Sequence, residues 1–225
     1  MRKFFQLDRT QRLRPARTGF LLVLAVVACA TPPPPPDPFL GTLSPGVEES
    51  RDVVVRVQQS TREIARLGKE LTFDQRRERL LKVGLANFDL SRMAELSYGP
   101  RYRDLSTAQR KTWLKTFILF RSSASAKLNS RDRGQSYRLI SFDQVSKRLV
   151  IIRTGIRYPR HAVEIIADYR LMSVAGEWKI FDRNSPPSVS ENAMRRAEYR
   201  TILEKEGFDG LILDMDRRIA GYSVP

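Results

Sequence analysis

The sequence predicts an α+β domain in which helices pack on one face of a curved, four-stranded antiparallel sheet. Three observations predict it. Apolar residues recur at helical spacing from about residue 47, and this spacing gives way to alternation after Asp132-Arg-Gly134. Helical spacing returns after Ser185-Pro-Pro187. The resulting order of helices, strands and helices is typical of helices laid over a single sheet.

Three helices are expected before the longest one. The first covers about residues 47–67, where apolar residues recur every three or four positions and Gly68 provides a stop. Thr72 and Gln75 have the spacing of a capping box and so open a second helix. Asp89 is expected to cap a short third helix.

The longest predicted helix follows a second capping box, formed by Ser106 and Gln109. Its apolar residues make a stripe wider than a surface helix needs. That stripe consists of Trp113, Phe117, Phe120 and Ala124, flanked by Leu114, Ile118 and Leu128. We therefore expect this helix to face a large apolar interior.

Four strands and two closing helices are predicted in the second half of the chain. The strands are expected at residues 137–142, 149–158, 162–174 and 177–182. The short connections between them favour antiparallel neighbours. Alternation in the third strand predicts one covered face and one wet face. The closing helices are expected at about residues 190–206 and 208–219, divided by Gly207.

The N-terminal 28 residues resemble a signal peptide. Six Lys/Arg residues precede an uncharged run of nine residues, Phe20 to Ala28. A permanent membrane span needs about 20 apolar residues, so this run is too short for one. The sequence therefore predicts an exported, periplasmic protein whose residues 1–28 do not belong to the fold.

Cys29 is the only cysteine, and two kinds of processing fit its surroundings. Ala28-Cys29-Ala30 suits ordinary signal cleavage, whereas Val26-Val-Ala-Cys29 resembles a lipobox whose cysteine is acylated. We favour lipidation at Cys29, because five consecutive prolines follow as an extended spacer. Residues 29–46 are then a lipidation site and proline-rich linker, and residues 47–225 form a single domain. One cysteine allows no internal disulfide.

The positive net charge of the chain favours anionic binding partners. The formal net charge of +15 falls to +10 when residues 1–28 are removed. In an exported protein this excess favours anionic lipid or another envelope polymer, and nucleic acid is not expected. The alternative is that the excess arginine only aids solubility.

The residues that most enzymes need are scarce. His161 is the only histidine, so the chain offers no pair of His and Cys ligands for zinc. No glycine-rich phosphate loop, GxSxG elbow or HExxH motif is present. Asp89, Asp168 and Asp182 fit a helix cap and the polar sides of strands. We therefore expect a protein that is not an enzyme and holds no metal or cofactor.

Several short motifs, in order, resemble the MlaC family, the toluene-tolerance group of periplasmic phospholipid carriers. They run from the helices through the strands to the last helix. They are Asn87-Phe-Asp-Leu-Ser-Arg-Met93, Tyr98-Gly-Pro-Arg-Tyr-Arg103, Ala167-Asp-Tyr-Arg-Leu171, Gly176-Glu-Trp-Lys-Ile-Phe-Asp182 and Gly207-Phe-Asp-Gly-Leu-Ile212. The chain departs from the family pattern at Ala124, where Tyr is usual, and at Glu191 and Arg195, where Leu and Tyr are usual.

The resemblance implies an MlaC-like fold, with a sheet of nuclear-transport-factor type, that binds a diacyl phospholipid. The acyl chains would lie between the long helix and the inward strand positions. The implied lipid-pocket residues are Trp113, Phe117, Phe120, Ile152, Ile156, Val163, Ile165, Tyr169, Leu171, Trp178 and Ile180. Arg101, Arg103 and Arg153 would contact the headgroup.

The resemblance also implies a role and partners. A monomeric carrier would exchange lipid with an inner-membrane ABC transporter complex and an outer-membrane lipoprotein complex of the Mla type, and so maintain outer-membrane asymmetry. The alternative is a membrane-tethered scaffold domain whose apolar residues fill an ordinary core. An apolar cavity would separate the two hypotheses.

Overall fold

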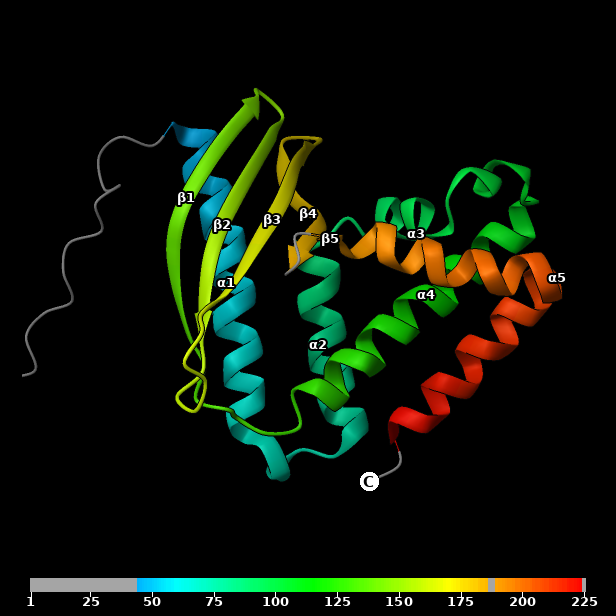
Figure 1. The fold of residues 1–225 in the computed structure, drawn as a ribbon, viewed down its shortest axis with the longest axis horizontal. Helices are drawn as coiled ribbons and strands as arrows, with labels where there is room; N and C mark the ends of the chain where they lie inside the picture. Colours follow the sequence, from blue (N-terminus) through cyan, green and yellow to red (C-terminus); the bar gives the residue numbers. More distant parts are fainter. Residues whose placement is uncertain (1–43, 186–188, 224–225) are drawn as a thin grey trace, which may run out of the picture. The chain divides into compact units, whose positions relative to one another are not determined.

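The computed structural model describes residues 44–185 and 189–223, so the predicted signal peptide and Cys29 lie outside the described residues. It contains five α-helices, five strands and two short 3-10 helices (Figure 1). In chain order they are α1 (Pro45–Leu67), η1 (Gly68–Glu70), α2 (Phe73–Asn87), α3 (Leu90–Tyr98), η2 (Pro100–Asp104), α4 (Thr107–Leu128), β1 (Ser136–Ser146), β2 (Leu149–Arg157), β3 (Ile165–Val174), β4 (Glu177–Ser185), β5 (Val189–Ser190) and α5 (Glu191–Ser223). The predicted α+β class is confirmed.

The helix starts follow the predicted caps. In both predicted capping boxes the two reciprocal bonds are formed: the Thr72 and Ser106 hydroxyls accept from the third backbone N–H of their helices. The Asp89 carboxylate accepts from the backbone N–H of Arg92, so it caps α3 as expected. Helix α1 begins at Pro45, slightly before the predicted start, because proline is well suited to the first helical position.

The strands form one antiparallel sheet in the order β1-β2-β3-β4-β5. The predicted number of four strands is wrong, because Val189 and Ser190 form a fifth strand against the end of β4. A two-residue strand is too short to show alternation, so the sequence pattern could not reveal it. Register shifts interrupt β1 and the β3–β4 ladder, and such bulges bend a sheet.

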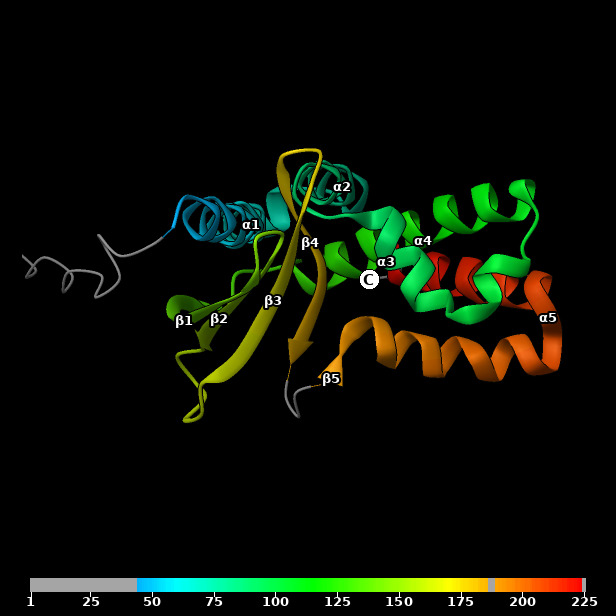
Figure 2. The ribbon, with the colours of Figure 1, turned by 90° about the horizontal axis from the view of Figure 1, so that it is seen from above.

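Helices cover one face of the sheet, as predicted. Figure 2 shows α1 and α2 along the same side of the strands. Inward residues of β2, β3 and β4 pack against four valines of α1, namely Val47, Val53, Val54 and Val57. The opposite face carries two ion pairs. Arg138 of β1 bonds Glu164, which directly precedes β3, and Arg153 of β2 bonds Asp168 on the neighbouring β3.

Gly207 divides α5, also as predicted. Its backbone angles, φ 68° and ψ −165°, are outside the helical region and lie where glycine is strongly favoured. The chain reverses direction there, so both halves of α5 lie beside α4 (Figures 1 and 2). This reversal brings Tyr199 and Leu203 from the first half together with Leu211 and Met215 from the second.

Candidate functional site

Two filled apolar cores flank the region between α4 and the sheet. The helical core joins α3, α4 and α5 around Trp113, Phe117 and Tyr199. The sheet core joins α1 to β2, β3 and β4 around Val54, Ile152 and other inward strand residues. Both contain side chains with almost no exposed surface. The side chains of these two cores leave the region between them as a candidate place for a ligand.

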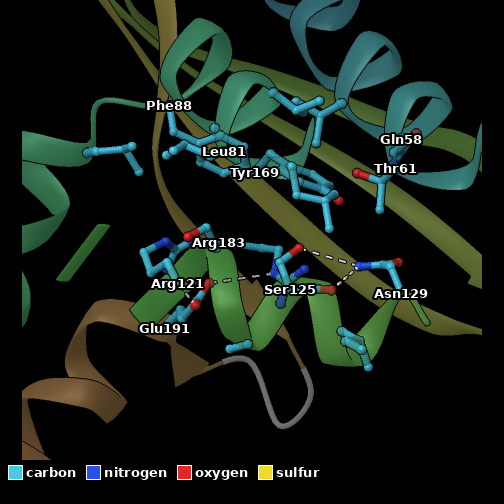
Figure 3. Close-up of a pocket in the computed structure, with 18 of the residues that line it drawn as sticks. Gln58, Thr61, Leu81, Phe88, Arg121, Ser125, Asn129, Tyr169, Arg183 and Glu191 are labelled. Atoms are coloured by element: carbon cyan, nitrogen blue, oxygen red, sulfur yellow. Dashed lines mark hydrogen bonds and ion pairs between the residues drawn. The ribbon is translucent and has the colours of Figure 1, made fainter. Parts of the chain in front are cut away.

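A cavity of about 330 Å³ lies there, within the range of 300–1,000 Å³ typical of ligand pockets. We call it the helix–sheet cavity. Helices α1, α2 and α4, the inner face of the sheet and the start of α5 contribute to its wall (Figure 3). Its apolar wall includes Val57, Leu80, Leu81, Val83, Phe88, Leu90, Ile118, Phe120, Leu128 and Ile156.

Small side chains in the second half of α4 explain why this space is open. Residues 122–126 read Ser-Ser-Ala-Ser-Ala, and Ser122, Ala124 and Ser125 all line the cavity. Tyr169 lines the same cavity from β3. A helix that presents Ala and Ser toward a sheet leaves unfilled the volume that Leu or Phe would otherwise occupy.

One end of the cavity, where β4 meets α5, is strongly polar. Arg121 Nη1 lies 2.7 Å from Glu191 Oε1, and Arg183 Nε lies 3.9 Å from Glu191 Oε2. Figure 3 shows these three side chains gathered on one side of the cavity. Burial opposes the charge of Glu191, but the attraction of Arg121 and Arg183 outweighs it and holds the pKa of Glu191 below its usual value.

The other end includes uncharged polar side chains from α1 and from the C-terminal end of α4. Gln58 Nε2 donates to Thr154 Oγ1 at 3.4 Å, and Asn129 Nδ2 donates to the Ser125 carbonyl at 2.9 Å. Figure 3 places Gln58, Thr61 and Asn129 on the side away from Arg121 and Glu191. The cavity is thus apolar along its length, with hydrogen-bonding groups at each end.

Three of the eleven predicted lipid-pocket residues line the cavity, namely Phe120, Ile156 and Tyr169. Trp113 and Phe117 instead lie in the helical core, at 0% and 1% exposure. The Trp113 indole N–H donates to the Ala94 carbonyl at 2.9 Å, which ties α4 to α3. The first half of α4 therefore faces other helices, and only its second half faces the cavity.

The other predicted strand positions also lie elsewhere. Ile152, Leu171, Trp178 and Ile180 are buried in the sheet core, where α1 covers the inner face. Val163 precedes β3 in the β2–β3 connection and is 75% exposed, and Ile165 at the start of β3 is 38% exposed. Alternation along a strand identifies the inward side, but it does not tell which part of that side a helix already covers.

The three predicted headgroup arginines do not line the cavity. Arg101 and Arg103 lie on η2, the short connection before α4, and both are exposed. Arg153 lies on the opposite face of β2, where it forms an ion pair with Asp168. The arginines that do line the cavity are Arg121, Arg131, Arg133, Arg183 and Arg195.

Arg121, Arg183 and Glu191 line the cavity but are not among the site residues predicted from the sequence. One signal was available for Arg121, because it directly follows Phe120 within the apolar stripe of the longest helix. Arg183 follows the last predicted strand residue, and Glu191 falls at the start of α5, so neither has a periodic signal. Their approach to Arg121 is a tertiary contact between α4, β4 and α5.

Comparison with known families decides the affiliation of the chain. The model of the family described as MlaC protein matches residues 55–217, which is most of the chain. The chain belongs to the MlaC family. This membership confirms the resemblance that the ordered motifs indicate. No curated protein sequence matches the chain.

A solved structure supports the same fold for this MlaC-family chain. It is a phospholipid-binding protein from Ralstonia solanacearum in complex with a phospholipid. The TM-score is 0.65 at 15% sequence identity, and the match covers 78% of this chain and 99% of that one. At this identity the similarity establishes the shared fold.

The described residues offer neither a metal-binding cluster nor a membrane-spanning helix. Within residues 44–185 and 189–223, no group of three or more His, Cys, Asp or Glu side chains is arranged to hold a metal ion. Among the helices in the described part of the chain, none is long and apolar enough to cross a membrane.

Proposed function

We propose that this MlaC-family protein is a periplasmic phospholipid carrier. It binds a diacyl phospholipid without changing it chemically and moves it between membranes. An inner-membrane ABC transporter complex and an outer-membrane lipoprotein complex of the Mla type are its proposed partners, and outer-membrane asymmetry is the proposed outcome. Family membership and the phospholipid complex of the Ralstonia protein support this role.

The helix–sheet cavity is the observation on which the proposal depends. Each acyl methylene kept out of water contributes about 0.8 kcal/mol of favourable free energy. Exposing two chains of about 16 carbons to the aqueous periplasm would therefore cost more than about 20 kcal/mol. A carrier must therefore supply an apolar wall. Leu80, Leu81 and Phe120 belong to such a wall, on helices that face the sheet.

The same cavity separates the carrier from the alternative of a scaffold domain. A scaffold needs only a filled interior, because an unfilled one costs stability. Here the small residues Ala124 and Ser125 border an open space. The larger residues of the two neighbouring cores pack against one another instead. An open, partly apolar space is more useful to a ligand-binding protein.

Extraction of lipid from the purified protein tests the proposal. The full chain, expressed with its own signal sequence, is isolated from the envelope fraction with mild detergent and then extracted with organic solvent. Mass spectrometry is expected to detect diacyl phospholipid in a defined ratio to protein. An extract with no more phospholipid than that of an unrelated envelope protein would contradict the carrier role.

Attachment to a membrane through lipidated Cys29 is a separate part of the proposal. The intact mass of the membrane-extracted protein distinguishes the two kinds of processing. Acylation predicts a chain that starts at Cys29 and carries the added mass of fatty acyl groups. A chain that starts after Cys29, or carries an unmodified Cys29, would exclude the lipid anchor and leave the carrier role intact.

A further inference from the structure

The polar end of the helix–sheet cavity contains more positive than negative charge. Three arginines line it, Arg121, Arg183 and Arg195, together with a single carboxylate, Glu191. We call Arg121, Arg183 and Arg195 the arginine cluster. A cavity that held only acyl chains would gain nothing from this cluster, because charged groups beside hydrocarbon are costly to desolvate. The cluster therefore needs an explanation beyond chain binding.

The carboxylates of the protein do not saturate these arginines. Glu191 is shared between Arg121, at 2.7 Å, and Arg183, whose Nε at 3.9 Å is too far away for a hydrogen bond. That Nε atom is buried and has no hydrogen-bond partner. A buried N–H of a charged group without a hydrogen-bond partner is energetically unfavourable, so this position favours an additional acceptor.

Arg195 is also only partly neutralised. It bonds Glu198 at 3.0 Å, but Glu198 is shared with Arg218, which also forms an ion pair with Asp214 at 2.7 Å. Within this network four arginines face three carboxylates, Glu191, Glu198 and Asp214. Nearby Asp182 is buried and does not line the cavity, and its Oδ1 accepts from the backbone N–H groups of Arg183 and Asn192.

Aromatic rings position two of the guanidinium groups. Arg121 lies over the rings of Phe88 and Phe117, at 5.8 and 5.7 Å from their centroids, and Arg195 lies over Phe120 at 5.2 Å. Stacking uses the face of a guanidinium and leaves its N–H edges free to bond oxygen atoms. Phe88 and Phe120 also line the cavity, so the charged and apolar walls are continuous.

From this geometry we infer that the arginine cluster is an anion-binding subsite that holds a phosphate or carboxylate group of an amphipathic lipid inside the cavity. The apolar chain of that lipid would lie along Leu80, Leu81 and Val83, with its anionic oxygens between Arg183 and Arg121. The inference rests on the proposed lipid-binding function and adds an orientation and a preference for anionic lipids. Arginine is suited to this role because its planar fork bonds two oxygen atoms at once.

Matched single-chain ligands test the preference directly. The delipidated full chain is titrated calorimetrically with palmitate, with palmitoyl lysophosphatidic acid and with uncharged monopalmitoylglycerol, each below its aggregation concentration. The chain length is the same, so only the polar group differs. We expect both anionic ligands to bind at least about tenfold more tightly than the uncharged one. Equal affinity for all three would overturn the inference.

Substitution of Arg183 tests whether the cluster causes that preference. Arg183→Gln is expected to weaken binding of palmitate by about tenfold or more and to leave monopalmitoylglycerol within about twofold. The control is Arg153→Gln. Arg153 lies on the opposite face of the sheet, where it forms two hydrogen bonds with Asp168, and its substitution is expected to change neither affinity. If Arg183→Gln weakened both ligands equally, the role of Arg183 would be structural and the inference would fail.

Substitution of Glu191 predicts a change in the opposite direction. Glu191→Gln removes the carboxylate that competes for Arg121 and Arg183, so palmitate should bind more tightly even though the variant is less stable. A thermal melt establishes that it is folded at the temperature of the titration. Arg121→Lys, which keeps the charge but loses the fork, should weaken palmitate binding and serves if Glu191→Gln does not fold. Weaker palmitate binding by folded Glu191→Gln would contradict the inference.

Inorganic phosphate identifies the source of the anion. We expect it to compete with palmitate only weakly, because it lacks the apolar chain that the rest of the cavity binds. Phosphate that bound as tightly as palmitate would overturn the assignment to a lipid. Failure of the subsite is distinguishable from failure of the carrier role, since phospholipid that co-purified regardless of headgroup charge would leave the carrier role in place.

Discussion

The two halves of α4 have opposite surroundings. In the first half, Trp113 and Phe117 are fully enclosed by α3 and α5 in the helical core. In the second half, Ala124 and Ser125 line an open space in front of the sheet. The difference shows that one continuous helix can supply stability at one end and room for a ligand at the other. Trp113 and Phe117 fill the first region, whereas the run of small residues 122–126 borders the second.

The largest expected effect is on the filled half. Trp113→Ala should lower the free energy of unfolding by about 3 to 5 kcal/mol, because it leaves a hole and removes the hydrogen bond to the Ala94 carbonyl. Denaturant unfolding followed by circular dichroism measures the loss. Lipid content per folded molecule should be unchanged, since Trp113 does not line the cavity. A loss of lipid with full stability would mean that the two halves of α4 are not distinct in this way.

Two substitutions in the second half of α4 should have smaller effects and should separate a filled site from a cavity-lining site within the same helix. Ala126 is fully buried against Ile64 and Leu80 in a filled cluster, whereas Ala124 faces the cavity. Ala126→Phe should be destabilising by about 1 to 3 kcal/mol, because the site has no room for the ring. Ala124→Phe should change stability by less than about 1 kcal/mol and should reduce lipid retention, because the ring occupies the space of the ligand.

Thermal or chemical unfolding, paired with lipid extraction, checks both variants. Opposite effects are expected: Ala126→Phe should lose stability but keep its lipid per folded molecule, and Ala124→Phe should keep its stability but lose lipid. If Ala124→Phe retained lipid in full, the cavity would not be where the chains bind. If Ala126→Phe were neutral, the region beside α2 would be more open than the structure indicates.

The parts of the fold that the sequence predicts correctly depend on short local motifs. Capping boxes at Thr72 and Ser106, the cap at Asp89 and the break at Gly207 each depend on a few neighbouring residues, and each is present. The strand β5 could not be predicted, because two residues have no period and their pairing partner is set by the chain between them. Neighbouring residues therefore predict where helices begin better than they predict which strand forms the edge of the sheet.

The site was predicted less well, and for a physical reason. Hydrophobicity identifies residues that are buried away from water. It does not distinguish a residue in a filled core from one that lines a ligand pocket, because both are removed from water. Trp113 and Phe117 are large and apolar, which predicts burial, and they are buried among other helices instead of lining the cavity. The cavity depends instead on the absence of bulk at Ala124 and Ser125. The arginine cluster required tertiary contacts between α4, β4 and α5, which no local pattern contains.

The smallest expected effect concerns Val163, which alternation assigned to the inner face. It lies outside the strand and is 75% exposed, so Val163→Ser should change the free energy of unfolding by no more than about 0.5 kcal/mol and leave lipid content unchanged. Ile156→Ser is the matched control, because Ile156 lines the cavity and packs against the sheet core, and it should reduce both stability and lipid retention. Parallel unfolding and extraction of the two variants measure this. Loss of lipid in Val163→Ser at full stability would show that the exposed β2–β3 connection takes part in binding, and it would extend the ligand-binding region beyond the second half of α4.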